Sequence, residues 1–177
     1  MPVAGTDETL TVDANVVQYA LLYEAGDELP PGLRVCRLPH FCSDVLAVRP
    51  VALNDFIEWQ YRQLLGDTAF QHWYKERAVR GLVVQVPIET IPEHVKSFLR
   101  TQYGCGNTWL ADDGKYVRTA VNTVAKCVVT EDNGDFRRQP RQRNRPCMVR
   151  YLQRELGVHV LSVDEACRWS EGADSAR

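Results

Sequence analysis

The sequence lacks any uninterrupted apolar stretch long enough to cross a bilayer, so no membrane-spanning segment is predicted. Its first eight residues are polar and acidic and lack the basic and apolar regions of a signal peptide, so we expect a cytoplasmic protein without membrane contact. It also lacks an excess of positive charge, because the formal net charge is -2. Any site for a polyanion therefore has to come from a local patch.

The chain of 177 residues suits one domain with one hydrophobic core. We expect a single domain over residues 1–177, with its core elements within about 9–169. Proline and glycine interrupt residues 27–44, which we expect to be an insertion or an irregular segment. A second polar segment, residues 137–146, is rich in arginine and is expected to form a basic loop.

Six cysteines without an export signal are expected to be reduced thiols rather than a disulfide framework. Cys36, His40 and Cys42 lie close enough in sequence to suggest zinc ligands. A structural zinc site usually needs four ligands, and the next cysteine along the chain is Cys105. We therefore favour a loop with partly buried thiols over a zinc site.

Short apolar runs alternate with segments whose apolar residues recur at helical spacing. We expect strands at residues 9–13, 45–48, 82–86, 126–130 and 158–161. We expect helices at residues 15–26, 50–65, 68–80, 92–103, 112–124, 146–156 and 162–169, with turns or loops at 104–108 and 131–144. This alternation predicts an α/β fold with a central, mainly parallel sheet and helices on its faces.

Two of the predicted strands end in acidic residues. Asp13 ends the first, and Asp132 follows another in which Thr130 is the last residue. If both strands are central and parallel, these side chains meet at the carboxyl edge of the sheet, where ligands bind in such folds. A third carboxylate, Asp112 or Asp113, begins the helix that leads into the second strand. Convergent carboxylates repel one another unless a cation neutralises them, and oxygen ligands suit Mg²⁺ or Mn²⁺.

Each of these acids also has a simpler explanation. An Asp at the start of a helix is commonly a cap, and a single Asp at the end of a strand is common as well. The indication of a metal site is therefore the expected convergence of several carboxylates.

Four segments resemble motifs of the PIN-domain nucleases. Residues 12–16 (V-D-A-N-V) resemble the opening motif of that family, and residues 113–120 (D-G-K-Y-V-R-T-A) resemble its D-x-x-x-x-x-x-A helix. Residues 128–132 (V-V-T-E-D), followed by D-F at 135–136, are similar to its T-x-D motif. Residues 156–165 are similar to its closing strand and helix. The resemblance spans about residues 10–169 and is poorest over 27–106.

The resemblance implies a PIN-like three-layer sandwich and a ribonuclease that depends on Mg²⁺ or Mn²⁺. Carried over residue by residue, it makes Asp13, Asp113 and Asp132 catalytic metal ligands, supported by Asn15 and by Thr130. The T-x-D motif carries one extra residue here, which leaves open whether Asp132 or Asp135 binds the metal; we favour Asp132 and give Asp135 a supporting role.

A further acid of the family lies early in the helix after the second strand. In this chain that helix is predicted at residues 50–65, and it offers Asp55 as first choice and Glu58 as second. The two lie three residues apart, so both could face the same edge of the sheet.

The expected substrate is RNA. A basic stretch after the last acidic motif could grip its phosphates, and it contains Arg137, Arg138, Arg141, Arg143 and Arg145; the alternative is a solvated loop. The aromatic residues Phe70, Trp73 and Tyr74 could stack bases, but we favour core packing or an oligomer interface for them.

The resemblance implies either the toxin of a toxin–antitoxin pair, bound by a small antitoxin, or a defence nuclease, and a homodimer is a further option. A catalytically inactive PIN-like interaction module remains the alternative function. A phosphotransfer or hydrolase domain with Asp13 as nucleophile is disfavoured, because Asn15 stands where such a domain would have a second Asp.

Overall fold

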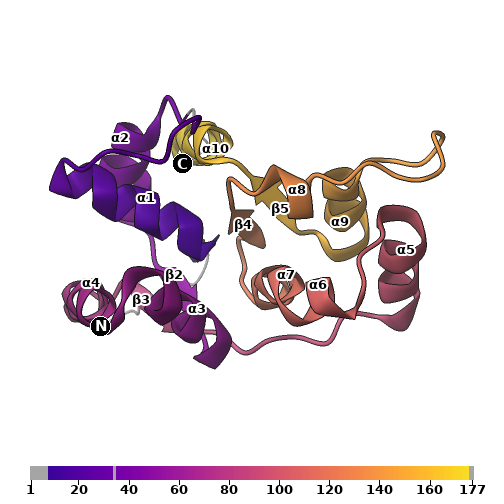
Figure 1. The fold of residues 1–177 in the computed structure, drawn as a ribbon, viewed down its shortest axis with the longest axis horizontal. Helices are drawn as coiled ribbons and strands as arrows, with labels where there is room; N and C mark the ends of the chain where they lie inside the picture. Colours follow the sequence, from indigo (N-terminus) through magenta and orange to yellow (C-terminus); the bar gives the residue numbers. More distant parts are fainter. Residues whose placement is uncertain (1–7, 34, 176–177) are drawn as a thin grey trace.

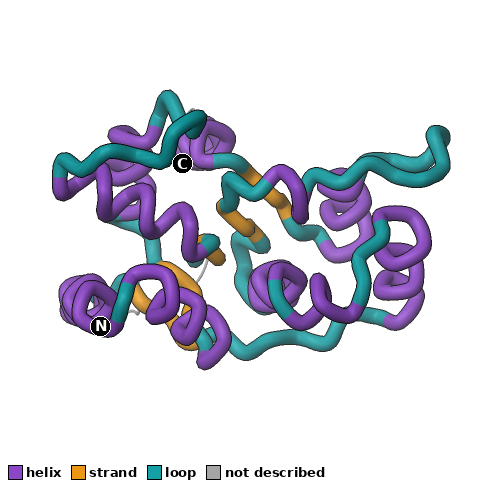
Figure 2. Tube along the Cα trace, in the orientation of Figure 1, coloured by secondary structure: helices purple, strands orange, loops and turns teal. Residues whose placement is uncertain are grey.

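The structure, a computed structural model, describes residues 8–33 and 35–175 and has an α/β fold with a small parallel sheet (Figures 1 and 2). The strands are β1 (Thr11–Val12), β2 (Val51–Leu53), β3 (Val83–Gln85), β4 (Cys127–Val129) and β5 (His159–Leu161). The helices are α1 (Ala14–Ala25), α2 (Leu38–His40), the π-helix η2 (Phe41–Leu46), α3 (Asp55–Leu65), α4 (Asp67–Val79), α5 (Glu93–Tyr103), α6 (Asn107–Ala111), α7 (Asp113–Val121), α8 (Asn133–Phe136), α9 (Met148–Leu156) and α10 (Val163–Ser175).

The strands form two parallel groups, β1-β4-β5 and β2-β3. A parallel bridge between Leu10 and Val51 joins the groups. Its hydrogen bonds run from the Leu10 N–H to the Pro50 carbonyl at 2.9 Å and from the Ala52 N–H to the Leu10 carbonyl at 2.8 Å. The resulting order is β3-β2-β1-β4-β5. The chain moves outward from β1 to β3 and then returns to the other side of β1, so the topological switch point lies between β1 and β4.

Helices cover the sheet because its central strands are apolar on both faces. Strands β1, β2 and β4 are buried throughout, as expected for parallel strands between layers of helices. Helix α7 packs against β1 and β4, and α9 packs against β5. Figure 1 shows α1 and α10 on one side of β4 and α7 on the other. The carboxyl ends of β1 and β4 therefore lie among the starts of several helices.

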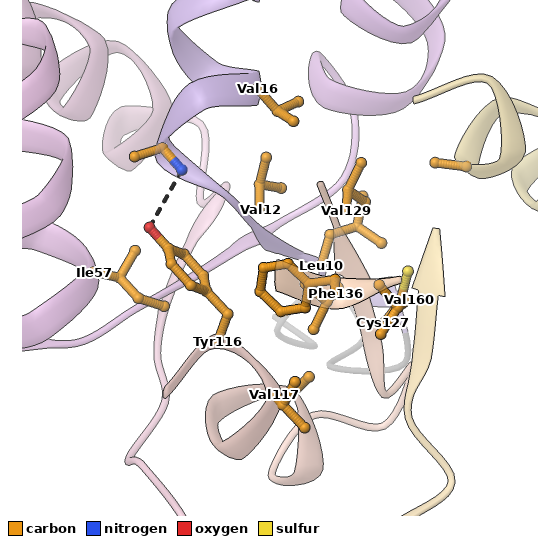
Figure 3. Packing of buried hydrophobic residues seen from close by; sticks show 14 of the residues in the cluster. Leu10, Val12, Val16, Ile57, Tyr116, Val117, Cys127, Val129, Phe136 and Val160 are labelled. Carbon is orange, nitrogen blue, oxygen red and sulfur yellow. Dashed lines mark hydrogen bonds between the residues drawn. The ribbon is translucent and has the colours of Figure 1, made fainter. Parts of the chain in front are cut away.

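The strands, α7 and α8 share one buried hydrophobic cluster (Figure 3). Val12 of β1, Val129 of β4 and Phe136 of α8 are each fully buried. Burying a side chain of this size contributes roughly 1.5–3 kcal/mol relative to leaving it exposed. The short helix α8 is thus anchored by Phe136, and this fixes the backbone beyond the end of β4.

The predicted α/β class and parallel strand arrangement are confirmed. Most predicted elements lie within a few residues of the observed ones, namely β1, α1, β3, α4, α5, α7, β4, α9 and β5. Helix α10 begins as predicted but runs on to Ser175 instead of ending at about residue 169. Residues 137–147 form no helix or strand, so the predicted basic loop is present, and Figure 1 shows it extending away from the rest of the molecule.

The prediction around the second strand is wrong. Residues 45–48 were expected to form a strand, but η2 runs to Leu46 and a turn follows. The true second strand occupies Val51–Leu53, where we predicted the start of a helix at Pro50. Helix α3 begins later, because the side chain of Asn54 accepts a hydrogen bond from the Ile57 N–H at 3.1 Å and caps it.

Two further corrections concern segments predicted to be irregular. Residues 27–44 include α2 and the first part of η2, so the segment is irregular only up to about residue 37. The predicted turn at 104–108 runs into α6, and the predicted loop at 131–144 contains α8. These helices have five and four residues, which is too short for a helical repeat to be visible in the sequence.

Within the ranges that the structure describes, no helix has the length and apolarity needed to span a membrane. All six cysteines are free thiols. Cys36 and Cys42 form no metal-binding group with His40 among the described residues. His40 instead contacts a carboxylate, its Nδ1 lying 2.6 Å from Asp44 Oδ2.

Candidate carboxylate site

Asp13 lies between the end of β1 and the start of α1. Its backbone N–H donates to the Val129 carbonyl of β4 at 2.9 Å, which continues the parallel ladder by one residue. Its carboxylate accepts the Asn15 N–H at 3.3 Å and the Thr130 hydroxyl at 2.7 Å. Asp13 is therefore both the N-cap of α1 and a buried carboxylate at the switch point, with only 5% of its surface exposed.

Thr130 connects Asp13 with Asp132. Its hydroxyl donates to Asp13 and accepts the Asp132 N–H at 3.0 Å. Asp132 in turn caps α8, because its carboxylate accepts the Asp135 N–H at 2.9 Å. The predicted supporting role of Thr130 thus has a geometric basis: one hydroxyl fixes the two strand-end acids relative to each other.

Asp113, Asp132 and Asp135 form the one group of candidate metal ligands found among the described residues. Each offers a carboxylate oxygen, and these three oxygens all lie within 4.8 Å of one another. All three residues are partly exposed, so a cation could reach them from solvent. The structure brings together Asp113 of α7 with Asp132 and Asp135 at the end of β4, and Asp13 lies buried beside them.

Burial and nearby acids disfavour the charged forms of Asp113 and Asp13. Burial is the main reason that the pKa of Asp113 is raised to about 7, and the neighbouring acids Asp135, Asp13, Asp132 and Asp112 raise it further. Burial also raises the pKa of Asp13, with Asp132 adding to the effect and the bonds to Thr130 and Asn15 opposing it. A divalent cation would relieve this repulsion, so the electrostatics fit the oxygen ligands that Mg²⁺ or Mn²⁺ prefers.

Trp109 supports the group from α6. Its indole N–H donates to the Asp135 carbonyl at 3.0 Å, and its ring packs edge-on against Phe136 at 6.3 Å between centroids. A Cβ atom on Gly114 would lie 2.9 Å from the Trp109 ring, so only glycine fits beside Asp113. Trp109 therefore fixes α7 and α8 relative to each other. Trp109 was not among the predicted site residues, although Gly114 in the first turn of a helix indicates a close approach of another segment.

Asp55 and Glu58 stand outside this group. Asp55 is exposed in the first turn of α3, and Glu58 is paired with Arg62 at 2.8 Å. The structure gathers Asp135 with Asp113 and Asp132 instead. Asn15 lies next to Asp13 but contacts it through its backbone N–H.

The predicted RNA-binding arginines fall into two sets. Arg137 is paired with Glu165, and Arg138 is paired with Asp135. Three others are exposed on the loop between α8 and α9, namely Arg141, Arg143 and Arg145. This second set is the more exposed one, although the Arg145 guanidinium also lies 5.7 Å from the centroid of the Phe98 ring.

The aromatic residues of α4 pack inward. Phe70 and Trp73 are 1% and 5% exposed, and both contact the ring of Tyr61 edge-on. Tyr74 is half-buried against Phe70. This supports core packing over base stacking for these residues.

The raised pKa of Asp113 predicts a pH-dependent stability. The folded protein keeps a proton on Asp113 that the unfolded chain releases at the ordinary carboxyl pKa of 3.8, so folding takes up a proton between about pH 4 and pH 7. In metal-free buffer the free energy of unfolding should fall as the pH rises through this interval. Asp113→Asn should remove part of that fall and stabilise the protein at neutral pH by on the order of 1 kcal/mol, allowing for solvent screening.

Urea unfolding in EDTA at about pH 5 and pH 8 measures this effect. Asp27→Asn is the matched control, because Asp27 is exposed and lies in the segment after α1. An equal loss of stability in wild type and Asp113→Asn would contradict the proposed strain on Asp113.

Comparisons of the chain with protein-family models, curated proteins and solved structures gave no match. Function is therefore inferred from the geometry of the site.

Proposed function

We propose that this chain is a metal-dependent ribonuclease with a PIN-like three-layer fold. The observation that carries the proposal is the convergence of four carboxylates, Asp13, Asp113, Asp132 and Asp135, at the switch point between β1 and β4. Burial together with the neighbouring acids raises the pKa of Asp113 to about 7, and a bound cation would favour its charged form. Structural caps would not require this crowding.

The donor set favours a hard cation. All candidate ligands are carboxylate oxygens, without sulfur or imidazole, which suits Mg²⁺ or Mn²⁺ better than zinc. Asp113, Asp132 and Asp135 would hold it, with Asp13 behind them. Such an ion would supply a water nucleophile and stabilise the charge of a phosphodiester undergoing hydrolysis. Thr130 keeps Asp13 and Asp132 in register, and Trp109 keeps Asp135 in place.

RNA is the proposed substrate, and the loop between α8 and α9 is the proposed contact. This loop begins directly after the helix that carries Asp135, and Arg141, Arg143 and Arg145 are exposed on it. Arginine binds phosphate through a planar fork of donors, so a strand held there could lead toward the carboxylates. A toxin bound by a small antitoxin and a defence nuclease are two cellular roles for this activity, and a homodimer is compatible with either.

An inactive PIN-like interaction module is the second candidate. It is favoured by the exclusion of Asp55 and Glu58 from the group and by the pairing of Asp135 with Arg138. The deciding experiment incubates the protein with labelled single-stranded RNA in Mg²⁺, in Mn²⁺ and in EDTA. If the protein is a metal-dependent nuclease, the RNA is cleaved in Mg²⁺ or in Mn²⁺ and is not cleaved in EDTA. Metal binding without cleavage would favour the module.

Arg138 competes with a cation for Asp135. Its guanidinium pairs with the Asp135 carboxylate and also donates to the Gly104 carbonyl at 3.2 Å. Arg138→Gln removes the charge and keeps a side-chain donor, so we expect Mn²⁺ to bind several-fold more tightly, which corresponds to about 1 kcal/mol. Calorimetric titration measures the affinity.

Arg143→Gln is the control for this prediction, since Arg143 is exposed on the same loop and the charge change is identical. It should leave Mn²⁺ affinity nearly unchanged. Unchanged or weaker Mn²⁺ binding by Arg138→Gln would show that Arg138 and the metal do not compete.

A further inference from the structure

A shallow hollow of about 500 Å³ lies between α3 and the start of α7, and the residues that line it are Asp55, Phe56, Trp59, Ile88, Asp112 and Lys115. We call it the aromatic hollow. It continues into a second hollow of about 440 Å³, with which it shares Asp55, Phe56 and Ile88. Asp112 directly precedes Asp113, so an occupant of the aromatic hollow would lie beside the proposed metal site.

Two aromatic rings form the floor of the hollow. Trp59 is 54% exposed, which is unusual for a tryptophan, and its ring centroid lies 6.4 Å from that of Phe56. Phe56 is held from below by Tyr116, whose ring it meets nearly edge-on at 5.9 Å. The result is an exposed aromatic surface on a rigid support.

The support is continuous with the carboxylate site. The Tyr116 hydroxyl accepts a hydrogen bond from the Ala14 N–H at 3.3 Å, drawn as the dashed line in Figure 3. Ala14 follows Asp13 directly. The surface formed by Phe56 and Trp59 is therefore tied to the strand end that carries the innermost acid.

The charges of the hollow select the kind of group that it can bind. Asp55 and Asp112 are both exposed, and Lys115 is the single cation among the six lining residues. Its ammonium lies 4.3 Å from the Phe56 ring centroid. A net negative rim repels phosphate, so the hollow suits an uncharged part of a nucleotide. Carboxylates there can accept hydrogen bonds from the amino groups of cytosine, adenine or guanine, which uracil lacks.

We propose that the aromatic hollow binds an unpaired, amino-bearing nucleobase of the RNA strand whose backbone reaches the carboxylates. The base stacks on Trp59, with Phe56 and the Lys115 ammonium above it forming the neighbouring wall, and Asp55 or Asp112 accepts its amino N–H. A base within a duplex has both faces covered, so the hollow also selects single strands. This inference rests on the proposed ribonuclease function, since it assigns a substrate subsite to the same site.

The test is a fluorescence titration in EDTA, where no cleavage takes place. Single-stranded oligocytidylate should quench the emission of wild-type protein, because Trp59 is 54% exposed. Of the other three tryptophans, Trp73 and Trp109 are 5% and 4% exposed, and Trp169 is half-buried with the Arg49 guanidinium 5.4 Å from its ring centroid. Oligouridylate of equal length should bind more weakly, and duplex RNA should not produce this quenching. In Trp59→Phe the quenching should disappear, while fluorescence anisotropy of labelled oligocytidylate still reports binding.

Two variants address the energetics by the same anisotropy assay. Trp59→Ala should weaken binding of oligocytidylate by about tenfold, as the loss of one stacking platform predicts. Asp55→Ala should reduce the preference for oligocytidylate over oligouridylate. Circular dichroism confirms that each variant is folded.

Equal binding of the two homopolymers, an unchanged affinity in Trp59→Ala, or equal quenching by duplex RNA would each overturn the proposal. The outcome is distinguishable from that of the ribonuclease proposal, because this titration needs neither metal nor cleavage. Base binding without cleavage in Mg²⁺ or Mn²⁺ would retain the subsite and reject the nuclease. Cleavage of RNA without quenching of Trp59 fluorescence would retain the ribonuclease proposal and reject the base-binding subsite.

Discussion

Asp132→Asn is expected to abolish RNA cleavage while leaving the fold intact. Asparagine caps a helix as well as aspartate does, so the bond from the Asp135 N–H that begins α8 is retained. The variant removes one charged oxygen from the group of three. A metal site contributes several kcal/mol of transition-state stabilisation, so a loss of about 4 kcal/mol, or roughly 10³-fold in rate, is expected. The initial rate of cleavage of a labelled RNA in Mg²⁺ or Mn²⁺ measures it.

Asp27→Asn is the matched control and should cleave at the wild-type rate, since Asp27 is exposed after α1 and distant in sequence from all four acids. Asp13→Asn should also be inactive. It keeps the cap of α1 but gives up the carboxylate oxygen that accepts the Thr130 hydroxyl. Wild-type rates in Asp132→Asn and Asp13→Asn would reject the carboxylate site as the catalytic centre.

Trp109→Ala is expected to destabilise the protein by about 3–5 kcal/mol, as for other buried aromatic residues. Trp109 is 4% exposed, fills the space above Gly114, and donates to the Asp135 carbonyl. Its removal leaves a cavity between α6 and α7 and an unpaired carbonyl at Asp135. Urea unfolding followed by circular dichroism gives the free energy of unfolding. We expect weaker Mn²⁺ binding in the same variant, because Asp113 and Asp135 lose their common support.

Trp59→Ala provides the control for this result, since it removes the same side chain from an exposed position. It should change the free energy of unfolding by less than about 0.5 kcal/mol and leave Mn²⁺ binding unchanged. Similar stability losses in the two variants would contradict the role assigned to Trp109.

The inner part of the site could be predicted from the sequence because it depends on local patterns. Asp13 and Thr130 each end a short run rich in apolar and β-branched residues, and such runs indicate central parallel strands. Once both strands are placed side by side, the meeting of Asp13 and Asp132 follows from the direction of the chain. The switch point between β1 and β4 thus required only the alternation of strands and helices.

The second strand could not be placed in the same way. Residues 45–48 and 51–53 are both apolar and short, and no periodicity distinguishes a three-residue strand from the end of a π-helix. The choice is made by tertiary contacts, since Val51 is bridged to Leu10 and pairs with Val83. Misplacing this strand made Pro50 look like a helix start and shifted the expected position of Asp55.

Which acids join Asp113 in the carboxylate group also depends on tertiary structure. Asp135 reaches the group because a four-residue helix turns the chain back after Asp132. That helix is anchored by Phe136 in the core and by Trp109 from a different segment. Neither contact has a sequence signature, so Asp132 and Asp135 were left as alternatives, whereas the structure places both in the group with Asp113.

Asp113, Asp132 and Asp135 are proposed to bind one divalent cation, and the proposed function depends on this. Calorimetric titration of Mn²⁺ into wild type and Asp113→Asn, at a pH above the pKa of about 7 of Asp113, tests this claim most directly. Saturable binding by wild type and at least tenfold weaker binding by Asp113→Asn is the result we predict. Equal affinities in the two proteins, or no binding by wild type, would contradict it.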